Sequence, residues 1–244
     1  MKSKLSARVV SEFLGTGFLV AAVVGSGIMA ERLSGGNVAL ALLANTVATG
    51  AALVALILAF GAISGAHFNP VVSVADAIEG GLAWPETLAY ILAQFSGGIA
   101  GTILAHRMFQ LPAISLSHHT RSGPAQLLSE FVATFGLLSV IWGCSRSRPN
   151  AVPFAVGSYI TAAYWFTAST SFANPAVTVA RSLSDTFAGI RPADVVPFVL
   201  AQLAGGLAAT FVFRWLIPGL RSSAEDIVLP HHGRDSPNVD TSAS

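Results

Sequence analysis

The sequence predicts an all-α membrane protein in which six helices cross the bilayer and two shorter half-helices enter it, arranged as an inverted repeat. Three observations support this fold class: a deficit of charge, the length of the apolar stretches and an internal repetition. Only 10% of the 244 residues are Asp, Glu, Lys or Arg, whereas a soluble globular protein carries about 25%. Hydrophobic residues make up 53% of the chain, and its mean hydropathy is +0.66.

The same composition excludes several other classes of protein. A disordered chain would need low hydrophobicity and high charge, and Cys144 as the single cysteine excludes a disulfide scaffold. The formal net charge of +1 offers no field to attract nucleic acid. The sequence contains no nucleophile motif and no phosphate-binding loop, and its histidine pairs lack a third close ligand for a metal. We therefore expect no enzyme activity, no cofactor, no metal and no nucleic-acid partner.

The charged residues leave long gaps between them. There are 43 residues without a formal charge between Arg32 and Asp76, and 32 between Arg148 and Arg181. A helix needs about 20 predominantly apolar residues to cross a bilayer. Each gap exceeds one crossing and contains turn signals, so each gap contains more than one straight helix.

Six stretches are long enough to cross, and the bilayer requires them to satisfy their own backbone hydrogen bonds as helices. Small residues such as those in Ser96-Gly97-Gly98 favour close packing between these helices. The six predicted crossings are Ser6–Met29, Val38–Phe60, Trp84–His106, Ala125–Gly143, Val152–Ala168 and Asp194–Leu216.

Two further apolar segments are too short to cross, and they begin at Asn69 and Asn174. Asn is a favoured N-cap and Pro a favoured first helical residue, so Asn69-Pro70 and Asn174-Pro175 predict helix starts. A helix of ten residues is about 15 Å long, half of a hydrocarbon core of roughly 30 Å. We interpret both segments as re-entrant half-helices.

The chain repeats three short strings in the same order, with offsets of 118, 105 and 108 residues. Three crossings in each half are an odd number, so the two halves have opposite orientations in the membrane. We assign residues 1–216 to one membrane domain, with repeat one at about 6–106 and repeat two at about 125–216, and 217–244 to a disordered cytoplasmic tail. The matched strings begin at Glu12 and Glu130, at Phe68 and Ala173, and at Leu92 and Leu200.

The two Asn-Pro pairs suggest a site for a solute. When Asn caps a helix, its carboxamide oxygen accepts backbone N–H bonds and its NH₂ group is left free. Inverted repeats bring both helix starts together near the bilayer midplane, where their positive dipole ends disfavour cations. We expect a solute oxygen to accept hydrogen bonds from Asn69 and Asn174 together.

At these residues the chain resembles the aquaporin, or major intrinsic protein, family. Its two signatures are Ser64-Gly-Ala-His-Phe-Asn-Pro-Val-Val-Ser and Phe172-Ala-Asn-Pro-Ala, which include Pro70, Val71, Pro175 and Ala176. The resemblance covers about residues 6–216, and Val71 departs from it because Ala is usual there. It implies a pore in each subunit, a homotetramer, and passive movement of water and small uncharged solutes through the cell (inner) membrane.

The resemblance also implies a second constriction, which spacing from the motifs assigns to four positions. Arg is usual at the last of them, where this chain has Val177, and none of the four is aromatic. A wide filter of this kind resembles bacterial aquaglyceroporins linked to arsenic resistance. It predicts passage of glycerol-like solutes and neutral metalloid acids, such as arsenous acid or methylated arsenicals. The four expected filter residues are Thr49, Ala162, Ser171 and Val177.

Other readings of the pore stay open. A water-selective aquaporin and an ion-coupled secondary transporter share parts of the pattern, because transporters also use inverted repeats and broken helices. A closed or degenerate pore is a further alternative.

Several polar residues fall inside the predicted helices. Glu12 and Glu130 are costly in lipid, and the resemblance implies that each braces its re-entrant loop, with a proton relay as the alternative. Gln94 and Gln202 are expected to join helices by hydrogen bonds. His67 is expected to line the pore, and a pH gate is the alternative.

The distribution of basic residues places both termini in the cytoplasm, by a margin of eight against five. The inside residues are then Lys2, Lys4, Arg8, Arg146, Arg148, Arg214, Arg221 and Arg234, and the outside residues are Arg32, Arg107, Arg121, Arg181 and Arg191.

Overall fold

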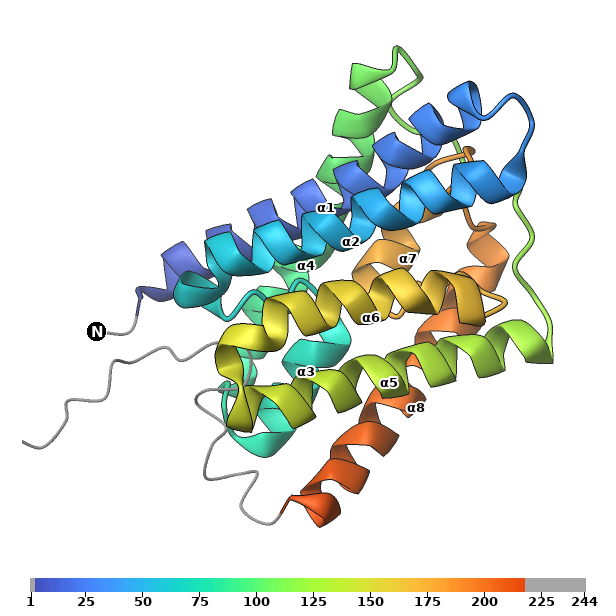
Figure 1. The fold of residues 1–244 in the computed structure, drawn as a ribbon. Coiled ribbons are helices and arrows are strands. Elements are labelled where there is room, and N and C mark those ends of the chain that lie inside the picture. Colours follow the sequence, from blue (N-terminus) through green and yellow to red (C-terminus); the bar gives the residue numbers. More distant parts are fainter. Residues whose placement is uncertain (1–2, 218–244) are drawn as a thin grey trace, which may run out of the picture.

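The computed structural model describes residues 3–217, and within them the regular structure is entirely helical (Figure 1). The expected tail at 217–244 therefore lies almost wholly outside the described residues. Five helices of the described chain are long and apolar enough to cross a membrane. They are α1 (Leu5–Leu33), α2 (Val38–Ser64), α4 (Trp84–Met108), α5 (Pro124–Ser147) and α8 (Pro192–Leu216).

The remaining predicted crossing is shorter than the others. It forms α6 (Val152–Phe166), which has 15 residues and follows a 3₁₀ turn, η1 (Pro149–Ala151). At 1.5 Å per residue α6 is about 22 Å long, and the 3₁₀ turn extends it towards α5. The predicted all-α membrane fold is confirmed, with boundaries within a few residues of those expected.

The two halves of the chain pack in the same way. Helix α1 lies against α2 and α4, and α5 lies against α6 and α8. Gly97 in α4 and Gly205 in α8 allow these contacts: an added Cβ would lie 2.2 Å from the Phe13 carbonyl oxygen at the first and 2.3 Å from that of Phe131 at the second. Both positions therefore bring one helix against the backbone of another, as small residues do in membrane proteins.

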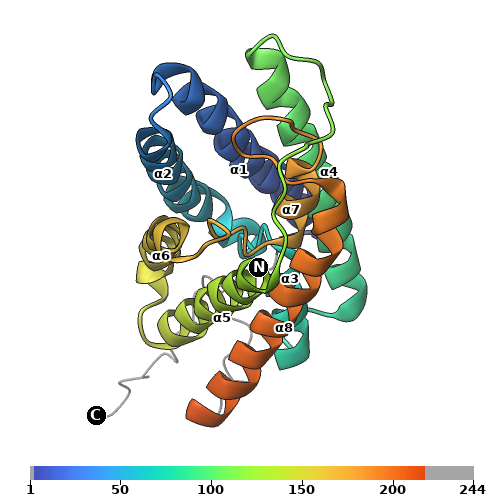
Figure 2. The same ribbon diagram turned by 90° about the vertical axis from the view of Figure 1, so that its right-hand side faces the viewer.

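The half-helices lie at the centre of the molecule. They are α3 (Pro70–Glu79) and α7 (Pro175–Arg181), and Figures 1 and 2 show both of them among the long helices. Helix α3 has the expected ten residues. Helix α7 has only seven, because the backbone tightens after it into turns in which the Ser182 N–H donates to the Val179 carbonyl.

The first turns of α1 and the last turns of α8 lie at the same end of the molecule. The guanidinium of Arg8 binds both carboxylate oxygens of Glu86, at 3.1 and 3.2 Å. Arg214 binds the buried Glu79 carboxylate at 2.5 Å. Glu79 and Glu86 flank the turn between α3 and α4, so this turn joins both ends of the described chain.

Candidate functional site: a central cavity between two half-helices

Each half-helix begins at an asparagine whose side chain caps it. The Asn69 Oδ1 accepts from the Val71 N–H at 2.9 Å, and the Asn174 Oδ1 accepts from the Ala176 N–H at 3.0 Å. Pro70 and Pro175 occupy the first helical positions, where the missing N–H has no consequence. The local sequence therefore determines where both half-helices start.

The two asparagines also connect the repeats. The Asn69 Nδ2 donates to the Ala173 carbonyl at 2.8 Å, and the Asn174 Nδ2 donates to the Phe68 carbonyl at 2.7 Å. The expectation that each NH₂ group is wholly free is therefore wrong for one of its two donors. Among the described residues, the second N–H of each group has no further hydrogen-bond partner.

The backbone just before each asparagine is strained. Ala66, Phe68, Ser171 and Ala173 all have φ between 48° and 51°, in the left-handed region that residues other than glycine seldom adopt. Such conformations cost about 1–3 kcal/mol each and persist where the surroundings impose them. The same two places are strained in each repeat.

Two buried carboxylates hold these strained segments. Glu12 accepts from the His67 N–H at 3.0 Å and the Phe68 N–H at 2.7 Å. Glu130 accepts from the N–H groups of Phe172 and Ala173, both at 2.9 Å. These contacts fit the bracing role and occupy both oxygens of each carboxylate.

The two glutamines extend each brace to the half-helix. The Gln94 Nε2 lies 2.8 Å from Glu12 and 2.9 Å from the Ser73 hydroxyl. Gln202 repeats this arrangement with Glu130 and Thr178, at 2.6 and 2.8 Å. Each carboxylate, glutamine and hydroxyl thus form one connected network behind a half-helix.

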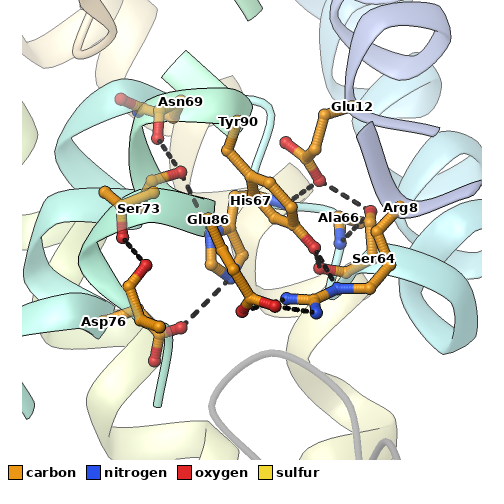
Figure 3. Close-up of polar contacts among 12 residues, drawn as sticks. Arg8, Glu12, Ser64, Ala66, His67, Asn69, Ser73, Asp76, Glu86 and Tyr90 are labelled. Atoms are coloured by element: carbon orange, nitrogen blue, oxygen red, sulfur yellow. Dashed lines mark hydrogen bonds and ion pairs between the residues drawn. The ribbon is translucent and has the colours of Figure 1, made fainter. Parts of the chain in front are cut away.

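His67 lines the central cavity and lies within a group of polar side chains (Figure 3). Its Nδ1 is 3.1 Å from the Ser73 hydroxyl, its Nε2 is 3.6 Å from the Asp76 carboxylate, and its ring meets Tyr90 edge-on. The Tyr90 hydroxyl accepts from Arg8 at 2.8 Å and donates to the Ser64 carbonyl at 2.9 Å. These contacts hold the imidazole against the wall.

A cavity of about 60 Å³ runs past the asparagine pair. A single water requires about 10–15 Å³ of such space, so the cavity has room for several water molecules. Most of its wall is aliphatic. Its polar side chains are Thr49, His67, Asn69, Tyr164, Ser171, Asn174 and Arg181.

Three of the four expected filter residues line this cavity: Thr49, Ser171 and Val177. Ala162 does not. It faces outwards in a shallow groove between α2 and α6, because the rotation of α6 about its axis turns a different face of the helix towards the cavity. The cavity instead receives Ile160 and Tyr164 from this helix, and the Tyr164 hydroxyl donates to Thr49 Oγ1 at 3.3 Å.

Arg181, one of the basic residues predicted to lie on the outer side of the membrane, is 2% exposed and lines the cavity. Its guanidinium carbon lies 3.4 Å from the centre of the Phe172 ring, and its Nε donates to the Ala188 carbonyl. Arg181 follows Val177 by four positions, so both lie on one face of α7. The four-residue spacing is visible in the sequence, but the family motif includes Val177 and not Arg181.

Head-to-head half-helices beside a narrow, largely aliphatic cavity, enclosed by apolar helices, define a multi-pass membrane protein with the architecture of a channel. A sequence model described as Major intrinsic protein matches residues 1–171. Aquaglyceroporin AqpS of Rhizobium meliloti (strain 1021) is 57% identical over 217 residues, which are 89% of this chain and 93% of that protein. The chain belongs to the major intrinsic protein family, as the motifs indicated.

One further relative and one solved structure are similar to the chain. A glycerol uptake facilitator protein of Streptococcus pneumoniae (strain ATCC BAA-255 / R6) is 31% identical over 170 residues, 61% of this chain and 70% of that protein. The X-ray structure of the aquaglyceroporin from Plasmodium falciparum has a TM-score of 0.65 and 19% identity, covering 89% of this chain and 99% of that one. This last likeness concerns the fold.

Proposed function

We propose that the protein is a passive membrane channel for water and small uncharged solutes, including glycerol-like molecules and neutral metalloid acids. The observation that carries the proposal is the pair of asparagines, each held by a cross-repeat hydrogen bond, in the wall of the central cavity. Each keeps one N–H donor for a passing solute. Aquaglyceroporin and glycerol facilitator relatives support the same class of solute.

The wall favours solutes with a polar and an apolar side. Asn69 and Asn174 supply hydrogen-bond donors. Val72, Ile141 and other aliphatic residues supply a surface that forms no hydrogen bonds with the solute. Polar groups that enter such a cavity must replace their lost water contacts. A polyol, urea or an undissociated metalloid acid can do so along one side only.

The filter region bears on the size of the solute. Val177 is short and uncharged where the family resemblance implies Arg, which leaves room for solutes larger than water. Tyr164 lies in the same cavity wall, so the proposed upper size limit lies near glycerol and the methylated arsenicals. Methylated arsenicals are the largest members of the proposed range.

Solute flux into proteoliposomes tests this function. We expect stopped-flow light scattering to show glycerol and urea permeability well above that of protein-free liposomes, and metal analysis to show uptake of trivalent arsenic. Flux of water alone would indicate a water-selective aquaporin instead. Uptake that saturates and requires an ion gradient would indicate a secondary transporter and contradict the proposal.

Val177→Arg tests the filter separately. The longer side chain enters the cavity and adds a second guanidinium one helical turn from Arg181. We expect glycerol permeability to fall at least about tenfold, with a smaller loss for water. Val177→Thr, which keeps the shape without the charge, is the matched control and is expected to retain glycerol flux. Unchanged glycerol flux in Val177→Arg would refute this placement of the filter.

We also propose a homotetramer with both termini in the cytoplasm. The outward groove between α2 and α6 exposes the small residues Ala51, Ser158 and Ala162, and small residues favour close contact between membrane helices. The shared end of α1 and α8 supports placing both termini on one side of the membrane. Native mass spectrometry of the detergent-solubilised protein measures the number of copies, and a monomer would contradict the first part.

A further inference from the structure

Arg181 is a charged side chain in the cavity wall whose hydrogen bonds are incomplete. Its Nη1 is buried without a partner among the described residues, and the same holds for the Ser171 hydroxyl. Both residues line the cavity. Buried donors normally have partners, and Ser171 directly precedes Phe172, whose ring Arg181 covers, so these two unpaired groups on one cavity mark a place where a ligand would complete the bonding.

The position of the guanidinium is fixed by its surroundings. Its face lies on the Phe172 ring and its Nε donates to the Ala188 carbonyl. A stacked, partly bonded guanidinium has little freedom to turn away, and its remaining N–H groups keep a planar fork geometry. The unpaired donor is therefore held in place before any ligand arrives.

Among the described residues, the charge of Arg181 has no direct counter-ion. Within residues 3–217 no carboxylate forms an ion pair with it. A second guanidinium, that of Arg121, lies 5.0 Å from the same Phe172 ring and donates to the Gly189 and Ser169 carbonyls. Burial lowers the pKa of Arg121 from its usual value.

Glu130 is the acidic group on the other side of this segment, and its oxygens already accept from the Phe172 and Ala173 N–H groups and from Gln202. The Glu130 carboxylate is therefore occupied by these three hydrogen bonds and makes no direct contact with Arg181. The wall near Phe172 has two cations and one occupied carboxylate, an excess of positive charge.

We propose that Arg181 and Ser171 form a binding site for a small monovalent oxyanion within the cavity. The guanidinium donates to the anionic oxygens and the Ser171 hydroxyl donates to another oxygen, while the aliphatic wall contacts the remaining apolar part. Charge-assisted bonds of this kind are about twice as strong as neutral ones. This inference rests on the proposed pore, because the bound anion then obstructs the path of neutral solutes.

Methanesulfonate is a suitable probe, because it is a permanent monoanion with three oxygens and a methyl group. Binding of radiolabelled methanesulfonate to the detergent-solubilised protein is measured by equilibrium dialysis, independently of flux. In proteoliposomes, sodium methanesulfonate is expected to inhibit water and glycerol flux in comparison with sodium gluconate, which is too large for the cavity. An absence of binding to the wild-type protein would overturn the proposal on its own.

Three variants locate the site. Arg181→Gln is expected to weaken methanesulfonate binding at least about tenfold, the loss of a charged hydrogen bond. Arg181→Lys is expected to keep part of the affinity because it keeps the charge, and Ser171→Ala to weaken it about threefold. Arg107→Gln removes one exposed cation outside the cavity and serves as the control.

The outcomes separate this inference from the proposed function. Equal binding by wild type, Arg181→Gln and Ser171→Ala would refute the site while leaving the channel intact. Binding without any water or glycerol flux would support the site and refute the channel. If Arg181→Gln fails to fold, Ser171→Ala and Arg181→Lys decide, because unchanged affinity in both would refute the site.

Discussion

At the scale of single residues, the cavity depends on side chains that hold an unfavourable backbone in place. Phe68 and Ala173 have positive φ directly before their asparagines, and Glu12 and Glu130 bind the N–H groups of these residues. A carboxylate can accept two backbone N–H bonds at once, which a neutral side chain does less well. The buried charge is therefore part of how the asparagines are positioned.

Glu130→Gln tests this dependence. The carboxamide offers one acceptor and turns an NH₂ group towards a backbone N–H, so one buried donor loses its partner, at about 1–3 kcal/mol. We expect the apparent Tm in detergent to fall by about 4–10 °C, together with glycerol flux. Tryptophan fluorescence during heating measures the first quantity.

Glu31→Gln is the matched control, because Glu31 lies at an exposed position near the end of α1. Its apparent Tm is expected to change by less than about 2 °C. Equal stability of Glu130→Gln and Glu31→Gln would show that the carboxylate at residue 130 is dispensable.

At the scale of elements, each half-helix is too short to be stable alone and depends on the long helices around it. Helix α7 lies against α1, α4 and α8, and α3 lies against α4 and α8. The α1–α4 and α5–α8 pairs form the rigid frame, because their glycines let the backbones touch. Separation of either pair would displace a glutamine from its carboxylate and thus a half-helix from its place.

Gly97→Ala tests the frame. The new Cβ would lie 2.2 Å from the Phe13 carbonyl oxygen, so α1 and α4 must separate. We expect a loss of stability of about 1–3 kcal/mol from overpacking, and a lower apparent Tm by the same fluorescence measurement. Gly143→Ala is the control, since a Cβ added there would lie 3.6 Å from its nearest neighbour, the Phe213 ring. A Gly97→Ala protein as stable as Gly143→Ala would contradict this account.

At the scale of the whole molecule, the sequence supports the architecture well. The uncharged stretches and the repeated strings correctly located the long helices and both half-helices, because the bilayer restricts the chain to helices and Asn-Pro determines where a helix starts. The contacts of Glu12 with Phe68 and of Glu130 with Ala173 follow the repeat, so one half of the chain predicts the other.

The cavity wall was predicted less well, for a physical reason. Which face of α6 meets the cavity depends on the rotation of that helix, and its apolar residues surround it on all sides, so spacing placed Ala162 where Tyr164 lies. The burial of Arg181 depends on the turn after α7, which the sequence does not specify. The positive φ values of Phe68 and Ala173 could not be predicted either, because Phe and Ala seldom adopt them.

The orientation of the molecule in the membrane gives the last prediction. Helix α1 has 29 residues and is about 43 Å long, more than the roughly 30 Å hydrocarbon core, so Lys4 and Leu33 emerge on opposite sides. In a Cys144→Ser background, Leu33→Cys is expected to react with a membrane-impermeant maleimide in intact cells. Lys4→Cys is expected to react only after the membrane is permeabilised, because the excess of basic residues places the N-terminus inside. The reverse labelling pattern would invert the proposed topology and place the Arg181 side of the cavity towards the cytoplasm.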